Sequence, residues 1–197
     1  MRIDAIELYY VTLPLKYPWK TAYGEDSEIH SVLVKAVSGE NEGWGETTPF
    51  FAPTYSPETA GSVFFLLQQV FGPLLVGEEI ETATELNERL APFKGNPFAK
   101  AIHDLSMENG IPAWVGGMLE SGIGAGICVE LASLTNFTYP GDLFPSERFY
   151  AQDLTEPPLV LQPGCVFNVP DVPGTPYKPI QERIDKVTLR HAVVRNN

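Results

Sequence analysis

The strongest constraint on the fold of this chain is a near alternation of β-branched and aromatic side chains over residues 2–13. On an extended backbone Ile6, Leu8 and Tyr10 fall on one face, and Tyr9 falls on the other. Side chains two residues apart share a face in a strand but not in a helix. Residues 2–13 are therefore predicted to form a strand.

A second run, at residues 31–37, alternates in the same way. It is followed at 39–43 by a stretch with a glycine at each end and an asparagine between them, a composition that suits a chain reversal into Trp44-Gly45-Glu46. The three segments predict an antiparallel meander of about three strands.

Two predicted loops accompany these strands, at residues 16–27 and 47–55. Their aromatic side chains are Trp19, Tyr23, Phe50, Phe51 and Tyr55. Aromatic side chains in loops more often pack over a neighbouring core than touch a ligand. From the pattern alone, packing is the favoured interpretation.

Three helices are predicted next. The first starts at Ser56-Pro57, where serine can cap and proline loses no needed hydrogen bond, and it ends at Gly72-Pro73. The others cover 82–90 and 96–105, where apolar residues recur at helical spacing. Three strands followed by three helices indicate an α+β domain.

The second half of the chain predicts a strand, helix, strand unit with parallel character. A short apolar strand at 111–115 precedes two glycines, an apolar helix covers 122–134, and a strand follows at 137–139. The proline-rich remainder is predicted to be extended, apart from a weak helix at 180–190.

Composition excludes several classes of partner. The 25 acidic and 13 basic side chains give a net charge of −12, which repels nucleic acids and anionic membranes. No run approaches the ~20 apolar residues of a membrane span, and no leader pattern opens the chain. Cys128 and Cys165 lack metal or disulfide spacing. We expect a cytoplasmic protein without nucleic-acid or membrane partners.

Six sequence motifs, taken in order, resemble a known family. They are Leu13-Pro14-Leu15, Gly43-Trp44-Gly45-Glu46, Tyr55-Ser56-Pro57-Glu58-Thr59, Phe93-Lys94-Gly95-Asn96, residues 114–124 and residues 136–142. The first four resemble the capping domain of the enolase superfamily, of the mandelate racemase and muconate lactonizing enzyme type. The last two resemble barrel strands seven and eight of its o-succinylbenzoate synthase and N-acylamino acid racemase group.

The resemblance implies three parts. Residues 1–105 would be the N-terminal capping domain, 106–160 a partial (β/α)₈ barrel, and 161–197 an extended tail returning towards the cap. A complete barrel needs roughly 250 residues. The resemblance therefore implies that barrel strands one to six are absent and that the two flanking regions join at Ser106-Met107.

The missing strands carry the chemistry of the family. Its members hold Mg²⁺ with an Asp, Glu, Asp set on strands three to five, and the cation stabilises an enediolate. Their acid/base lysines lie on strand six and in a Lys-x-Lys motif on strand two, a motif that this chain lacks. We therefore expect no metal and no catalytic residue in this chain. Glu120 and Asp142 lie near strand ends, where loop orientation is the favoured role for Glu120.

What remains would bind substrate rather than transform it. By resemblance, aromatic side chains of the two cap loops cover an aromatic or acyl group of a small-molecule carboxylate, and the glycine turn lines the barrel side. The expected binding residues are Trp19, Tyr23, Phe50, Tyr55, Gly116, Gly117 and Met118. The intact relatives form o-succinylbenzoate for menaquinone synthesis or racemise N-acylamino acids, and the motifs suit both.

Three hypotheses follow for the function. The first is an inactive remnant of such an enzyme, which self-associates through exposed strand edges and apolar faces. The second is a non-catalytic module that pairs with a full-length paralogue through a strand edge. The third is an active lyase or racemase from whose sequence an internal segment has been lost at Ser106-Met107.

Overall fold

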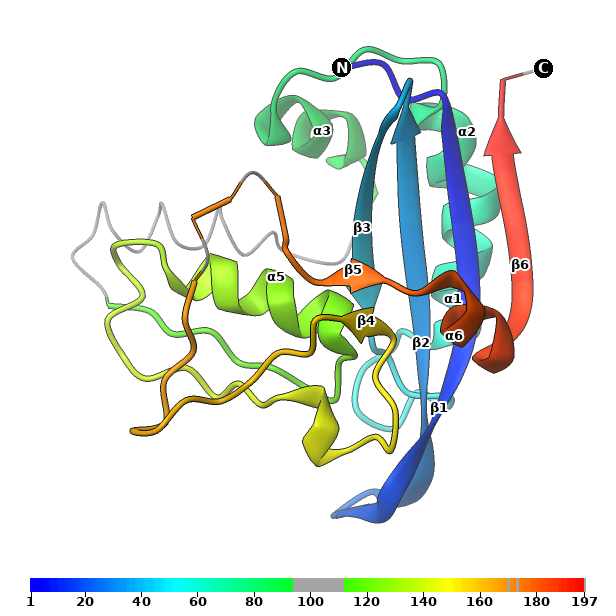
Figure 1. Cartoon of the computed structure of the whole chain (residues 1–197). Helices are drawn as coiled ribbons and strands as arrows, with labels where there is room; N and C mark the ends of the chain where they lie inside the picture. The colour runs from blue at the N-terminus through cyan, green and yellow to red at the C-terminus, as the bar shows by residue number, and fades with distance from the viewer. Residues whose placement is uncertain (94–111, 170, 173, 197) are drawn as a thin grey trace.

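A four-stranded antiparallel sheet forms the middle layer of the molecule (Figure 1). The computed structural model describes residues 1–93, 112–169, 171–172 and 174–196. The strand order is β3-β2-β1-β6, and the strands are β1 (Ala5–Thr21), β2 (Gly24–Ser38), β3 (Asn41–Thr47) and β6 (Thr188–Arg195). The predicted antiparallel meander is confirmed, and a fourth strand from the far end of the chain extends it.

The hairpin of β1 and β2 is longer than predicted. Residues 16–27, predicted to be a loop, are the far end of this hairpin, whose pairing continues to Thr21 and Gly24 after an irregularity between Pro14 and Trp19. That prediction was wrong because this end of the hairpin projects past the core. Most of its side chains are exposed, so it lacks the apolar alternation that indicates a strand.

The carboxyl-terminal helix is shorter than predicted. α6 covers Gln181–Val187, and the chain then enters β6, whose Arg195 pairs with Ala5 of β1. Both chain ends consequently lie at the same end of the sheet (Figure 1). The partner that makes this segment a strand lies at the other end of the sequence, where a local pattern cannot reveal it.

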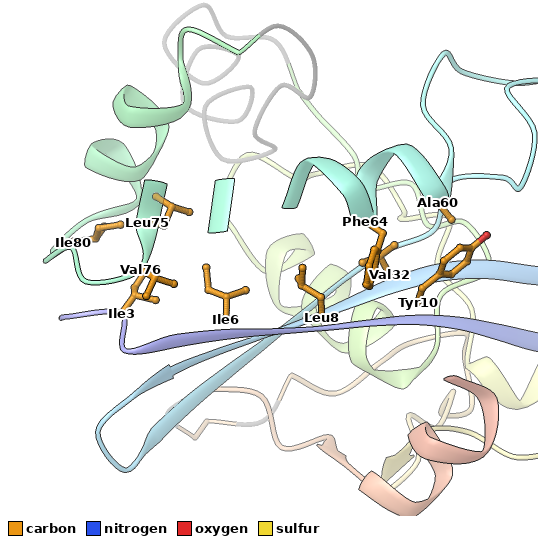
Figure 2. Close-up of a cluster of buried hydrophobic side chains, with 10 residues drawn as sticks. All are labelled: Ile3, Ile6, Leu8, Tyr10, Val32, Ala60, Phe64, Leu75, Val76 and Ile80. Carbon is orange, nitrogen blue, oxygen red and sulfur yellow. The ribbon is translucent and has the colours of Figure 1, made fainter. Parts of the chain in front are cut away.

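One face of the sheet packs against the helices that follow β3. Ile6, Leu8 and Tyr10 share this face, as predicted, and Figure 2 shows them below the side chains of the covering segment. The buried cluster consists of Ile3, Ile6, Leu8, Tyr10, Val32, Ala60, Phe64, Leu75, Val76 and Ile80. Burial of this apolar area is the main source of stability on this side.

The covering helix differs from its prediction at both ends. α1 (Ala60–Leu66) starts after Thr59, whose side chain and that of Ser62 cap each other's backbone, rather than at Ser56. It continues through a π turn, η1 (Leu67–Phe71), into α2 (Gly72–Leu75). A Gly-Pro pair normally ends a helix, but here the wider π turn before Gly72-Pro73 allows the helix to continue.

The opposite face of the sheet packs against elements from the second half of the chain. They are α5 (Gly122–Ala132), α6 and the residues that follow the 3₁₀ turn η2 (Ser146–Arg148). The buried cluster consists of Tyr9, Val11, Leu13, Ile29, Leu33, Leu119, Ile123, Tyr150, Leu154 and Ile184. β1 therefore contributes buried side chains to both faces.

The strands predicted around α5 are present only as isolated parallel bridges. Ala113 pairs with Phe137 and Gly116 with Asp142. The predicted helices at 82–90 and 122–134 are observed as α3 (Ala83–Leu90) and α5. β4 (Thr155–Glu156) pairs with β5 (Lys178–Pro179) in the tail.

Part of the prediction lies outside the described residues. This applies to the helix at 96–105, to residue 111 of the apolar strand and to the Ser106-Met107 join. None of the helices in the described part of the chain could cross a membrane, because none is both long and apolar enough.

Burial of β1 leads to a test by substitution. Leu8 is fully buried in the sheet, so Leu8→Ala should lower the free energy of unfolding by about 2–5 kcal/mol. Leu189→Ala, at a side chain 58% exposed on β6, should change it by less than about 0.5 kcal/mol. Urea unfolding followed by circular dichroism measures both, and equal losses would contradict the layered core.

Candidate functional site

The four aromatic side chains predicted to bind ligand form one continuous row. The ring centroids of Trp19 and Phe50 lie 5.4 Å apart, those of Phe50 and Tyr55 5.8 Å, and those of Tyr55 and Tyr23 6.2 Å. We call these four residues the aromatic row. The hairpin of β1 and β2 supplies two of them and the loop after β3 the other two.

The aromatic row runs from the core to the solvent. Trp19 is half-buried against the cluster beneath α5, whereas Tyr23 and Tyr55 are 60% and 64% exposed. Phe51 is not part of the row, because its ring lies against His30, 4.9 Å between centroids. The exposed end therefore offers aromatic faces to a ligand, while the buried end fixes their position.

A pocket of about 210 Å³ lies beside the buried end of the row. Its lining residues are Leu15, Tyr17, Pro18, Trp19, Leu119, Arg148 and Phe149. We call this cavity the Trp19 pocket. It lies between the outer part of β1 and the segment around η2, so residues far apart in the sequence form its walls.

The glycine turn predicted to line the barrel side lies next to the pocket but does not line it. Gly117 donates its N–H to the carbonyl oxygen of Asp142 at 2.8 Å, and Met118 donates to both carboxylate oxygens of Glu120 at 2.7 and 2.8 Å. The pocket lining does not include Gly116, Gly117 or Met118, but it does include the next residue, Leu119. Glu120 holds this turn, in agreement with its favoured role.

Glu46 is an important residue that sequence reasoning missed. Its carboxylate accepts hydrogen bonds from the N–H of Ser121 at 3.1 Å, the hydroxyl of Ser121 at 2.5 Å and the N–H of Gly124 at 3.0 Å. Glu46 ends the Gly-Trp-Gly-Glu motif on β3, and these bonds fasten the meander to the start of α5. Only its place in that motif could have drawn attention to it.

Burial governs the electrostatics of this carboxyl group. Loss of hydration raises the pKa of Glu46 to about 7, although its three donors favour the charged form, and the nearby Glu120 adds repulsion. Burial likewise raises the pKa of Glu120, and the pKa of Cys128 rises to about 12 through burial and both carboxylates. A thiol so far from ionisation is a poor nucleophile at neutral pH.

A second carboxylate also binds the start of α5. Asp153 accepts the N–H of Gly122 at 2.8 Å and the hydroxyl of Thr155 at 2.9 Å. A β-carbon on Gly122 would lie 2.4 Å from the carboxylate of Asp153, so only glycine permits this approach. The helix start is thus enclosed by two acidic side chains.

The described residues do not fit a magnesium site. No three side chains of His, Cys, Asp or Glu converge there in a way that could hold a metal ion. The carboxylates of Glu46, Glu120 and Asp153 already accept backbone N–H groups. Mg²⁺ requires oxygen ligands in near-octahedral geometry, which this arrangement does not supply.

The fold is that of enolase-superfamily proteins. A solved member of this superfamily from Listeria innocua superposes with a TM-score of 0.86, at 16% sequence identity, over 100% of both chains. The four-stranded sheet with its helices fits the capping domain of that class. No protein-family model matches the chain.

Relatives found by sequence show which enzymes of this superfamily the chain resembles. An N-succinylamino acid racemase of Thermus thermophilus is 36% identical over 200 residues, 96% of this chain and 50% of the relative. An N-succinylamino acid racemase of Amycolatopsis is 50% identical over 90 residues, which are 46% of this chain and 24% of the relative. An o-succinylbenzoate synthase of Geobacillus stearothermophilus is 36% identical over 103 residues, which are 52% of this chain and 27% of the relative. The resemblance to this group is confirmed. The chain spans half or less of the length of these relatives.

The raised pKa of Glu46 predicts a pH-dependent stability. The folded state holds the proton of Glu46 up to about pH 7, whereas the unfolded chain loses it near the ordinary value of 4.5. Stability is therefore highest below pH 4.5 as far as this group is concerned, and falls by up to about 3 kcal/mol as pH rises to 7.

Glu46→Gln keeps the side chain uncharged and should remove most of this fall. Chemical unfolding between pH 5 and 8 measures the slope, which Glu120 shares in the same direction. Glu182→Gln, on the exposed side of α6, serves as the matched control and should keep the wild-type slope. A Glu46→Gln slope equal to the wild-type slope would show that Glu46 is charged throughout this range.

Proposed function

We propose that this chain is a shortened relative of the o-succinylbenzoate synthases and N-succinylamino acid racemases that binds a small-molecule carboxylate without transforming it. The aromatic row carries this proposal, because side chains from the β1–β2 hairpin and from the loop after β3 form one continuous row whose buried end, Trp19, lines a pocket. Loops that carry function on a rigid scaffold are the expected place for such a site. The aromatic or acyl part of the ligand would lie against the row.

The same proposal assigns parts of the intact enzymes to this chain. Residues 1–105 would be the cap, 106–160 a remnant holding barrel strands seven and eight, and 161–197 the returning tail. The two parallel bridges that flank α5 support the remnant. The coverage of half or less of each relative supports the loss of the other strands.

Lack of catalysis follows from the same assignment. The Mg²⁺ ligands and the catalytic lysines expected by resemblance belong to the missing strands. The carboxylates described at the start of α5 hold backbone instead. We expect the protein to act in the cytoplasm as a ligand-binding protein.

Assays on the purified full chain test the proposal. In the presence of Mg²⁺ the protein should show no synthase and no N-succinylamino acid racemase activity, while o-succinylbenzoate should quench its tryptophan fluorescence. Tyr55→Ala should weaken that binding about twofold to tenfold, the range for loss of one aromatic contact. Phe51→Ala, from the same loop but outside the row, should leave it unchanged.

Either of two results would reject this function. Turnover by the wild-type chain at rates that scale with protein concentration would support the hypothesis of an active enzyme. An intact mass above 21.7 kDa for the protein from its native source, with extra sequence between Ser106 and Met107, would do the same. Equal binding by the wild type, Tyr55→Ala and Phe51→Ala would reject the aromatic row as the site.

A second candidate function is that of an interaction module. Trp114 and Tyr139 are 55% and 58% exposed, and both lie in the segments joined by the parallel bridges. Large exposed aromatics beside short, incompletely paired strands favour association with another chain. Self-association, or pairing with a full-length paralogue, would cover them.

Sedimentation velocity tests this second candidate. The wild-type chain should show a concentration-dependent dimer or larger species, and the double variant Trp114→Ser with Tyr139→Ser should shift it to the monomer because the apolar contact is removed. Phe65→Ser removes an equally exposed aromatic from α1 and should leave association unchanged. A wild-type monomer at all concentrations would contradict self-association.

A further inference from the structure

We propose that Arg148 in the Trp19 pocket binds the carboxylate of a ligand whose aromatic or acyl body lies against Trp19 and Phe149. This inference rests on the proposed function, ligand binding at the aromatic row, and adds the group that recognises the charge. The ligand class is a small monocarboxylate with a single ring or a short acyl chain attached.

The lining of the pocket supplies the apolar half of the recognition. Six of its seven residues are aliphatic or aromatic, and Arg148 is the charged one. At about 210 Å³ the pocket is smaller than the roughly 300–1,000 Å³ of sites for drug-sized ligands. It therefore suits one ring or a short chain rather than a larger molecule.

The guanidinium group of Arg148 is oriented and available. It lies over the ring of Phe144, with the carbon of the guanidinium 4.5 Å from the ring centroid. Within the described residues no carboxylate forms an ion pair with it, whereas Arg89 and Arg183 are both paired with glutamates. A guanidinium group has five N–H donors in a planar fork, and this fork can bind a carboxylate through two parallel hydrogen bonds.

The walls of the pocket are joined to each other by hydrogen bonds close to Arg148 in the sequence. Lys16 of β1 donates its backbone N–H to the carbonyl oxygen of Phe149 at 2.8 Å. The hydroxyl of Tyr150 donates to the carbonyl oxygen of Leu119 at 2.5 Å. A pocket held in this way needs little rearrangement on binding, which favours affinity.

The local charge also favours an anion. The ammonium group of Lys16, which does not line the pocket, donates to the carbonyl oxygen of Glu147, the residue before Arg148, at 2.5 Å. In a chain of net charge −12, the one charged residue that lines this apolar pocket is a cation, and a second cation, Lys16, contacts the residue before it. They would attract a carboxylate that the rest of the surface repels.

Binding of two matched probes to the full chain tests the assignment. 3-Phenylpropionate carries the proposed carboxylate, and 3-phenylpropionamide has the same shape without the charge. Tryptophan fluorescence should show tighter binding of the acid by the wild type. Arg148→Gln should weaken binding of the acid about tenfold and leave the amide unchanged, because a hydrogen bond to a charged group is lost.

Arg190→Gln is the matched control, because Arg190 also lies over an aromatic ring, that of Tyr10, on another part of the sheet. It should bind both probes as the wild type does. Thermal melting of each variant verifies that the fold is retained, which is expected because Arg148 is exposed.

The outcomes separate this inference from the proposed function. If Arg148→Gln binds 3-phenylpropionate as tightly as the wild type, or if the wild type does not bind it, the role of Arg148 is overturned. Binding of o-succinylbenzoate that depends on Tyr55 would then still support the proposed function. If Arg148→Gln selectively loses the acid while Tyr55→Ala binds o-succinylbenzoate normally, the Arg148 assignment holds and the aromatic row does not.

Discussion

The position of β1 between β2 and β6 is the constraint on which the rest of the structure depends. β1 forms backbone hydrogen bonds with a strand on each side. Its side chains alternate between two buried clusters, one under α1 and α2 and the other under α5 and α6. Because β6 comes from the other end of the chain, this single strand holds together segments that are distant in the sequence.

The sequence predicted those parts of the fold that local patterns determine. Alternation identified the first two strands, the turn composition at 39–43 indicated the third, and helical spacing identified α3 and α5. It missed β6 and the outer part of the β1–β2 hairpin, because both depend on pairing rather than on a buried face. It also ended a helix at Gly72-Pro73, because the π turn that lets the helix continue has no composition signal.

The candidate site was predicted in part, and by resemblance rather than by pattern. Trp19 and Tyr55 were expected at the site from the two cap loops, and the structure joins them in one row through Phe50. Arg148 was not expected, because it belongs to none of the motifs and most of its pocket neighbours come from β1, which is distant in the sequence. Glu46 escaped for the same reason, since its partners lie 75 or more residues away.

The two carboxylates at the start of α5 have a consequence for ligand selection. Free N–H groups at the first turn of a helix attract external anions such as phosphate. Here the protein's own Glu46 and Asp153 already satisfy three of those groups, on Ser121, Gly122 and Gly124. The N–H groups at the start of α5 are therefore not available to an external anion. An acidic metabolite would have to bind to a cationic side chain elsewhere on the surface.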